Sequence, residues 1–183
     1  LNFLRSKPED FVATLQDPVV VGFACYQWNF KASLKLANFI KRQFPSCLIV
    51  LGSYSVPHIP SHVEDFMKAH PFVDVLVHDE GELSFSEILL ALLEGRSFSK
   101  VEGISYRSIE VPSGYITSEK RNEFIDLNDT PSPFLNGLYD QLMDKYKKSV
   151  TGVVWETSRG CPYACTFCGW GKTDGRKIRK VDL

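Results

Sequence analysis

Three cysteines near the end of the chain have the residue type and the spacing to bind a metal centre. Cys161, Cys165 and Cys168 lie close together in the stretch TSRGCPYACTFCGWG. A tight loop with this CxxxCxxC spacing can turn three thiolates toward one point. Three thiolates leave one position of a tetrahedral or cuboidal site open, and in an iron–sulfur cluster the open iron binds an external ligand. The spacing therefore predicts a metal site with room for a further ligand.

Zinc is the main alternative for this cluster of thiols. A structural zinc ion usually takes four protein ligands, and no further Cys or His follows nearby, so a distant histidine would have to complete the site. The histidines share no ligand spacing, and we interpret all of them as surface or loop residues: His58, His62, His70 and His78. Cys25 and Cys47 lie in or beside apolar segments, so we interpret both as buried small hydrophobic residues.

The composition is that of an ordinary soluble globular protein. Among 183 residues, 44% are hydrophobic and the net charge is −1, which gives no indication of binding to nucleic acid or to a membrane surface. No apolar run approaches the roughly 18 residues that a membrane span needs. Five cysteines, an odd number and partly clustered, favour metal binding over disulfides in a reducing compartment. We therefore expect a cytoplasmic protein.

Three strand–helix units precede the cysteines and must position any ligand site. Continuous apolar runs predict buried strands over 19–25, 47–52 and 73–79. Apolar spacing and capping signals (Asn29, Ser61 with Glu64, Ser84 with Glu87) predict helices over 30–44, over 62–69 and from 84 to about 94. Beyond them we expect a β-hairpin over 103–118, a Pro/Gly-rich connector over 128–137 and one more strand over 152–158.

This order predicts an open parallel α/β sheet with right-handed crossovers. Ligands of such sheets bind at the carboxyl ends of the strands. The strand-end residues that we expect to contact a ligand are Tyr26, Gln27, Trp28, Gly52, Ser53, Tyr54, Glu80 and Gly81. Small residues would admit a ligand close to the backbone, while aromatic and amide side chains offer stacking and hydrogen bonds. On the pattern alone, ordinary connecting loops explain these segments equally well.

The stretch ETSRGCPYACTFCGWG resembles the cluster loop of the radical S-adenosylmethionine (radical SAM) enzymes, including the aromatic residue before the last cysteine. The segments VVVGFACYQWN, CLIVLGSYSVPH, VDVLVHDEGELSFSEILLALLEG, VEGISYR and TPSPFLNG resemble the cobalamin-binding domain that precedes the barrel in one branch of that family. Together these similarities cover most of residues 15–175.

The resemblance implies that Cys161, Cys165 and Cys168 hold a 4Fe-4S cluster whose open iron binds S-adenosylmethionine. It implies that an electron from the cluster cleaves the sulfonium to give a 5′-deoxyadenosyl radical, and that cobalamin carries a methyl group or manages a substrate radical. A reducing partner such as a flavodoxin or ferredoxin would supply the electron. The resemblance points to methylation of an unactivated carbon, or to an anaerobic oxidative cyclase of the tetrapyrrole (Mg-protoporphyrin monomethyl ester) type.

The sequence departs from the family pattern in three respects. The cobalt-ligating motif Asp-x-His-x-x-Gly is absent, so that motif offers no lower histidine ligand. The usual Gly-Gly-x-His reads Gly52-Ser53-Tyr54-Ser55 here, and the usual Gly-Glu-Gly-Glu reads Asp79-Glu80-Gly81-Glu82. The family also has a strand and helix upstream and a barrel downstream, so we interpret the chain as a fragment that contains no catalytic residue and is inactive alone.

The predicted organisation is an incomplete Rossmann-like, cobalamin-binding-type domain over 1–100, a hairpin and connector over 101–150, and the first strand and cluster loop of a truncated radical SAM barrel over 151–183. An α/β module that is structural, or that senses cobalamin without catalysis, is the alternative from another functional class. The oligomeric state does not follow from the sequence.

Overall fold

The structure is a computed structural model that describes residues 7–122, 125–163, 165–168 and 178–182. The chain divides into two compact units, residues 1–123 and 124–183. The first unit contains the α/β sheet and the second contains the three clustered cysteines. None of the helices in the described ranges combines the length and the apolar character needed to cross a bilayer.

The first unit alternates strands and helices and then adds two further strands. Its elements are α1 (Pro8–Val12), β1 (Val20–Ala24), α2 (Phe30–Gln43), β2 (Leu48–Gly52), α3 (Pro60–Ala69), β3 (Val75–Val77), α4 (Glu82–Leu93), the 3-10 helix η1 (Phe98–Lys100), β4 (Ile104–Arg107) and β5 (Tyr115–Thr117). The three predicted strand–helix units and the predicted hairpin are therefore confirmed.

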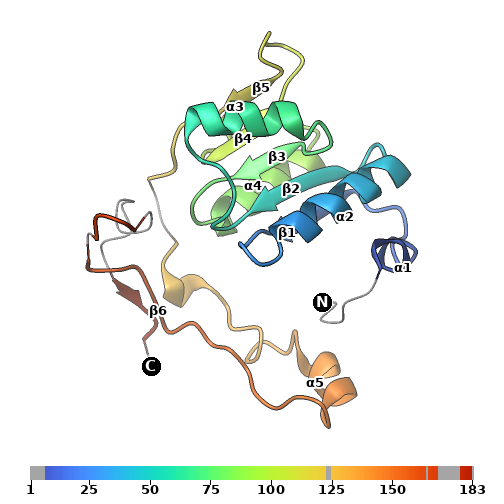
Figure 1. Ribbon diagram of the computed structural model, residues 1–183. Coiled ribbons are helices and arrows are strands. Elements are labelled where there is room, and N and C mark those ends of the chain that lie inside the picture. The colour runs from blue at the N-terminus through green and yellow to red at the C-terminus, as the bar shows by residue number, and fades with distance from the viewer. Residues whose placement is uncertain (1–6, 123–124, 164, 169–177, 183) are drawn as a thin grey trace. The chain divides into compact units, whose positions relative to one another are not determined.

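The five strands form one mixed sheet in the order β1-β2-β3-β4-β5 (Figure 1). Strands β1, β2 and β3 are parallel, with Ala24 beside Gly52 and Leu51 beside Leu76. Strands β4 and β5 continue the sheet in antiparallel pairing. The predicted parallel α/β sheet is thus confirmed over three strands, and the hairpin extends the same sheet.

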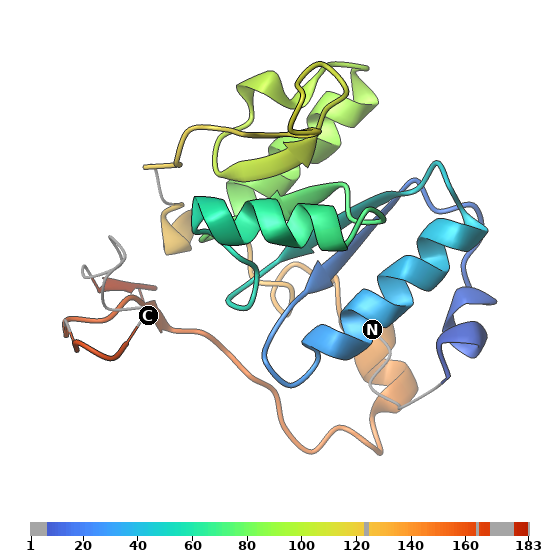
Figure 2. The same ribbon diagram turned by 45° about the horizontal axis from the view of Figure 1, so that its top comes forward.

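Helices cover both faces of this sheet (Figures 1 and 2). On one face, Ile40 of α2 and Met67 of α3 join a buried cluster with Leu51 of β2. On the other face, Ile88 of α4 joins a second cluster with Val50. Neighbouring residues of β2 belong to opposite clusters because strand side chains alternate between faces, which explains why this strand reads as a continuous apolar run.

Both predicted capping boxes are wrong. Helix α3 begins at Pro60 and α4 begins at Glu82, and neither N-cap side chain makes a capping hydrogen bond. Proline suits the first position of a helix because its missing N–H has no partner there anyway. Ser84 is fully buried within α4, where its hydroxyl donates to the carbonyl of Glu102 at 2.8 Å. Ser84 therefore makes a tertiary contact and does not cap the N-terminus of α4.

The second unit contains short elements. They are the 3-10 helix η2 (Leu127–Asp129), α5 (Asp140–Tyr146), β6 (Ser158–Arg159) and β7 (Arg179–Lys180). The predicted strand over 152–158 is wrong, because residues 151–157 have no regular structure and Val154 is 96% exposed. An apolar β-branched run forms a strand only where a neighbour completes its hydrogen bonds, and among the described residues β7 pairs only with β6.

Candidate functional site

The carboxyl ends of β1, β2 and β3 lie at one edge of the sheet because these strands are parallel and nearly in register. Gly52 is the last residue of β2, and the loops that follow the three strands carry the other seven strand-end residues proposed from the sequence. The first two loops are joined by backbone hydrogen bonds: Cys25 N donates to Gly52 O at 2.8 Å, and Ser55 N donates to Cys25 O at 3.0 Å. The structure therefore places the predicted residues at one edge of the sheet.

The β1–α2 loop is braced by Asn29. Its Oδ1 accepts a hydrogen bond from Tyr26 N at 2.7 Å, and its Nδ2 donates to Ala24 O at 2.9 Å. The sequence predicted Asn29 as the cap of α2, but its side chain makes no capping bond to the helix. Asparagine side chains readily bond to nearby backbone in this way. This brace fixes the backbone from which Tyr26 and Trp28 project.

Exposed aromatic rings stand on the first two loops. The rings of Tyr26 and Trp28 are stacked, with centroids 4.8 Å apart and planes 2° from parallel. Trp28 is 82% exposed and Tyr54, in the β2–α3 loop, is 68% exposed. Gln27, the residue between Tyr26 and Trp28 in the sequence, is also exposed. These side chains present flat apolar surface and amide groups to solvent, which suits a large planar ligand with polar edges.

Two residues at this edge have left-handed backbone conformations. Ser53 has φ 75° and Asp79 has φ 54°, a region that favours glycine because it crowds a Cβ atom. Both positions correspond to glycines in the pattern that the sequence resembles. Gly81 remains, and a Cβ there would lie 3.3 Å from Val77 Cγ1, tighter than most contacts.

His78 lies at the start of the β3–α4 loop, but it is not the surface residue that the sequence predicted. It is partly buried, and burial lowers its pKa to about 4, an effect that the charge of Asp79 opposes and that of His58 reinforces. Its Nε2 lies 2.8 Å from Ser105 Oγ. His70 is also partly buried, and burial lowers its pKa. No local sequence signal marks either environment, because both depend on neighbouring strands and helices.

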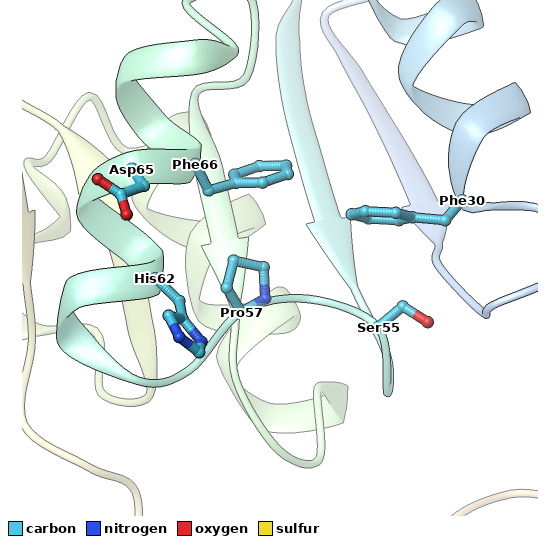
Figure 3. Close-up of a pocket in the computed structure, with 6 residues that line it drawn as sticks. All are labelled: Phe30, Ser55, Pro57, His62, Asp65 and Phe66. Carbon is cyan, nitrogen blue, oxygen red and sulfur yellow. The ribbon is translucent and has the colours of Figure 1, made fainter.

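A shallow pocket lies between the start of α2 and α3, beside the β2–α3 loop (Figure 3). The lining residues are Phe30, Ser55, Pro57, His62, Asp65 and Phe66. The rings of Phe30 and Phe66 have centroids 5.9 Å apart. None of the eight strand-end residues lines this pocket, and sequence analysis did not propose any of its lining residues. Their grouping depends on two helices meeting over the sheet.

Cys25 and Cys47 are confirmed as buried small residues. Both side chains are fully buried, and burial raises the pKa of Cys25 to about 11 and raises that of Cys47. Neither thiol ionises readily at neutral pH, which is unfavourable for metal binding. The three clustered cysteines differ from them because Cys165 is exposed while Cys161 and Cys168 are partly buried, and all are free thiols.

The cysteine loop is closed at its base by the pairing of β6 with β7, which lie on either side of it in sequence. Cys168 N donates to Cys165 O at 3.1 Å, so these two cysteines share one turn. Beside the loop, both carboxylate oxygens of Glu156 accept hydrogen bonds from Arg159, at 3.1 and 2.7 Å. The hydrogen bond from Arg159 also lowers the pKa of Glu156.

The donor set of the loop fits an iron–sulfur cluster in its chemistry. Three free thiols with CxxxCxxC spacing are the ligands that such clusters use. Within the described part of the chain, His, Cys, Asp and Glu side chains are nowhere gathered into a metal-binding group. Metal ligands commonly come together only when the metal binds, so the thiols would have to converge on the cluster.

No protein-family model matches the sequence. Among individual proteins, the cobalamin-dependent radical SAM methyltransferase TokK of Streptomyces tokunonensis is 34% identical over 183 residues, 98% of this chain and 26% of TokK. The 2-(S-pantetheinyl)-carbapenam-3-carboxylate methyltransferase of Streptantibioticus cattleyicolor is 37% identical over 184 residues, 98% of this chain and 26% of the enzyme. The chain thus spans about a quarter of the length of these relatives.

An anaerobic magnesium-protoporphyrin IX monomethyl ester cyclase of Synechocystis is also related, at 30% identity over 80% of this chain and 28% of the cyclase. Among solved structures, the cobalamin-dependent S-adenosylmethionine radical enzyme OxsB, with aqua-cobalamin and S-adenosylmethionine bound, shares the fold with a TM-score of 0.66. That match has 24% identity and covers 94% of this chain and 22% of OxsB. In sequence and in fold, this chain belongs to the cobalamin-dependent radical SAM enzymes, of which it represents one part.

Proposed function

We propose that this chain supplies the corrinoid-binding domain and the cluster loop of a radical SAM methyltransferase that methylates an unactivated carbon atom. The observation that carries the proposal is the combination in one chain of a free CxxxCxxC thiol loop and an α/β sheet whose three strand-end loops open at one edge. In this proposal residues 1–100 form the corrinoid-binding domain, 101–150 the hairpin and connector, and 151–183 the start of the radical SAM domain.

Cobalamin fits the strand-end edge. The ring of Trp28 and that of Tyr54 offer apolar surface to a corrin, while Gln27 offers an amide. Gly52 and Gly81 belong to the set as residues of this edge, although the position that a Cβ would take at each of them faces Val77. Ser53 and Glu80 complete the set that we assign to cobalamin together with Tyr26, which supports the ring of Trp28 by stacking. These residues bind and orient the cofactor and exclude water, and its reactivity is its own.

The thiols of Cys161, Cys165 and Cys168 would hold the 4Fe-4S cluster, and S-adenosylmethionine would bind the iron that lacks a thiolate. The bound groups supply an electron for cleavage of S-adenosylmethionine and a carrier for the methyl group. We also propose that a small electron-transfer protein, a flavodoxin or ferredoxin, provides the electron. The protein's own task is to present three thiolates from one loop, which the β6–β7 pair closes at its base.

Methyl transfer is favoured over cyclisation by the extent of similarity. Both methyltransferases match 98% of this chain, whereas the Synechocystis cyclase matches 80% of it at lower identity. A structural or sensory module without catalysis would not need a loop of three free thiols.

The proposal is tested by measuring cofactor content. The protein is purified without oxygen, reconstituted with iron and sulfide, and its visible absorption is recorded with and without hydroxocobalamin after unbound cofactor is removed. We expect a broad iron–sulfur band together with retained corrinoid bands. Alanine at Cys161, Cys165 and Cys168 should remove the iron–sulfur band and leave the corrinoid bands.

Cys47→Ala is the matched control, because it removes a buried thiol outside the loop and should leave the iron content unchanged. Equal iron in the wild type and in the triple variant would refute the cluster assignment. A complete iron–sulfur spectrum without retained cobalamin would refute the corrinoid assignment.

A further inference from the structure

A series of hydrogen-bonded polar side chains links strands β5 and β4 to the loop after β3, at the candidate site. Thr117 Oγ1 on β5 lies 2.8 Å from Ser105 Oγ on β4, which lies 2.8 Å from Nε2 of His78 after β3. Ser105 is fully buried. Because Ser105 holds Nε2 from the neighbouring strand, the orientation of the imidazole ring is fixed.

The other ring nitrogen of His78 is the exception in this series. Nδ1 is buried and has no hydrogen-bond partner among the described residues. A buried polar atom without a partner costs about 1–3 kcal/mol, so such atoms usually have a reason. The next residue, Asp79, has a left-handed backbone, and strained residues of this kind gather at ligand sites. Two independent irregularities therefore fall on neighbouring residues of one strand-end loop.

We propose that Nδ1 of His78 is a binding contact for a primary amide group on the edge of the corrin ring. The inference rests on the proposed function, because it takes the corrinoid as the ligand of this edge. A primary amide both donates and accepts hydrogen bonds, so it matches either tautomer of a neutral imidazole. Burial keeps His78 uncharged at neutral pH. Since Nδ1 is covered in the structure, side chains of the surrounding loops must move when the amide reaches it.

Two measurements on the same protein test this contact. The first is the dissociation constant for hydroxocobalamin, measured by absorption, for the wild type and His78→Gln. We expect about tenfold weaker binding, which corresponds to about 1.4 kcal/mol for a lost hydrogen bond. The second is the ¹⁵N spectrum of histidine-labelled protein, in which the Nδ1 resonance of His78, assigned with the same variant, should shift on addition of hydroxocobalamin.

Two further variants separate a contact from a general loss of stability. His70→Gln removes another partly buried histidine, one that packs on Phe66 and Phe72, and should leave the dissociation constant unchanged. Ser105→Ala frees the ring to rotate and should weaken binding less than His78→Gln does.

The outcomes distinguish this inference from the proposed function. If the wild type does not bind hydroxocobalamin, both are wrong. If the wild type binds and His78→Gln binds equally well, or if the Nδ1 resonance does not move, the His78 contact is wrong and the corrinoid-binding function stands. Equal weakening by the His70 and His78 substitutions would also overturn the contact.

Discussion

Ser53 and Asp79 keep left-handed backbone conformations at the carboxyl ends of β2 and β3. Glycine adopts this region without a steric penalty, whereas a side chain meets the backbone there. In the sequence, serine and aspartate stand at these two positions, where the family pattern has glycine. In the structure, both residues that stand in place of these glycines adopt the backbone region that glycine favours.

Replacing Ser53 with glycine should therefore stabilise the protein. Relief of the left-handed strain outweighs the extra backbone entropy of glycine, and we expect about 0.5–1 kcal/mol more stability in urea unfolding. The reverse substitution is available at Gly95, which has φ 62° and nothing within 4 Å of the position that a Cβ would take. Gly95→Ala should destabilise by about 1 kcal/mol. A loss of stability in Ser53→Gly would show that its side chain is needed.

Helix α4 is tied to the segment after β5 by Arg121. Its Nε donates to Ser84 Oγ at 3.1 Å, and its guanidinium pairs with Glu87. The Arg121 side chain is 11% exposed and that of Glu87 is 38% exposed, so solvent screens the pair in part. Gly103 lies against the same serine. It has φ 71°, and a Cβ there would lie 3.2 Å from Ser84 Oγ. The serine and glutamate that resemble a capping box thus join a helix to a strand-end segment.

Arg121→Gln should destabilise the first unit by about 1 kcal/mol, because it leaves the buried Ser84 hydroxyl and the partly exposed Glu87 carboxylate without their charged donor. Glu87→Gln should cost a similar amount, and the double variant should cost little more than either single one. Chemical unfolding of the three variants gives the coupling. Strictly additive losses would contradict the contact. Lys68→Gln breaks the exposed pair with Glu64 and is the control, with a much smaller effect expected.

At the scale of the whole molecule, buried His78 makes stability depend on pH. An imidazole titrates near 6.5 in the unfolded chain, while burial lowers the pKa of His78 to about 4 in the fold. Between these values the unfolded state binds a proton that the folded state does not, so stability is complete above pH 6.5 and falls as the pH drops toward 4. Burial also lowers the pKa of His70, so this histidine adds to the loss of stability at low pH.

Unfolding free energies measured from pH 7 down to pH 4 should fall, with His78 contributing on the order of 3 kcal/mol. In His78→Gln this contribution disappears and the remaining slope is shallower, while His70→Gln keeps most of it. Identical pH dependence in the wild type and His78→Gln would show that His78 carries no such penalty. The test compares the slope of the unfolding free energy against pH in the wild type and in His78→Gln, and not the stability at one pH.

The sequence by itself determined the strands β1 and β2, the helix α2 and the hairpin, and the spacing of the three clustered cysteines carries the prediction of a metal site. These features follow from local periodicity, turn residues and spacing, which require no knowledge of neighbours. It also predicted that the carboxyl ends of β1, β2 and β3 lie at one edge of the sheet, because these strands are parallel. Gly95 ended α4 as expected, with φ 62° and its N–H bonded to Leu92 O.

Only the tertiary structure decided what partners the polar side chains take. Ser84 and Glu87 bond to Arg121, and His78 bonds to Ser105 on the next strand. Nor could the pattern show that residues 152–157 lack a pairing strand among the described residues. A local sequence pattern shows which hydrogen bonds a side chain is able to make. The residues that the fold brings beside it decide which of these hydrogen bonds forms.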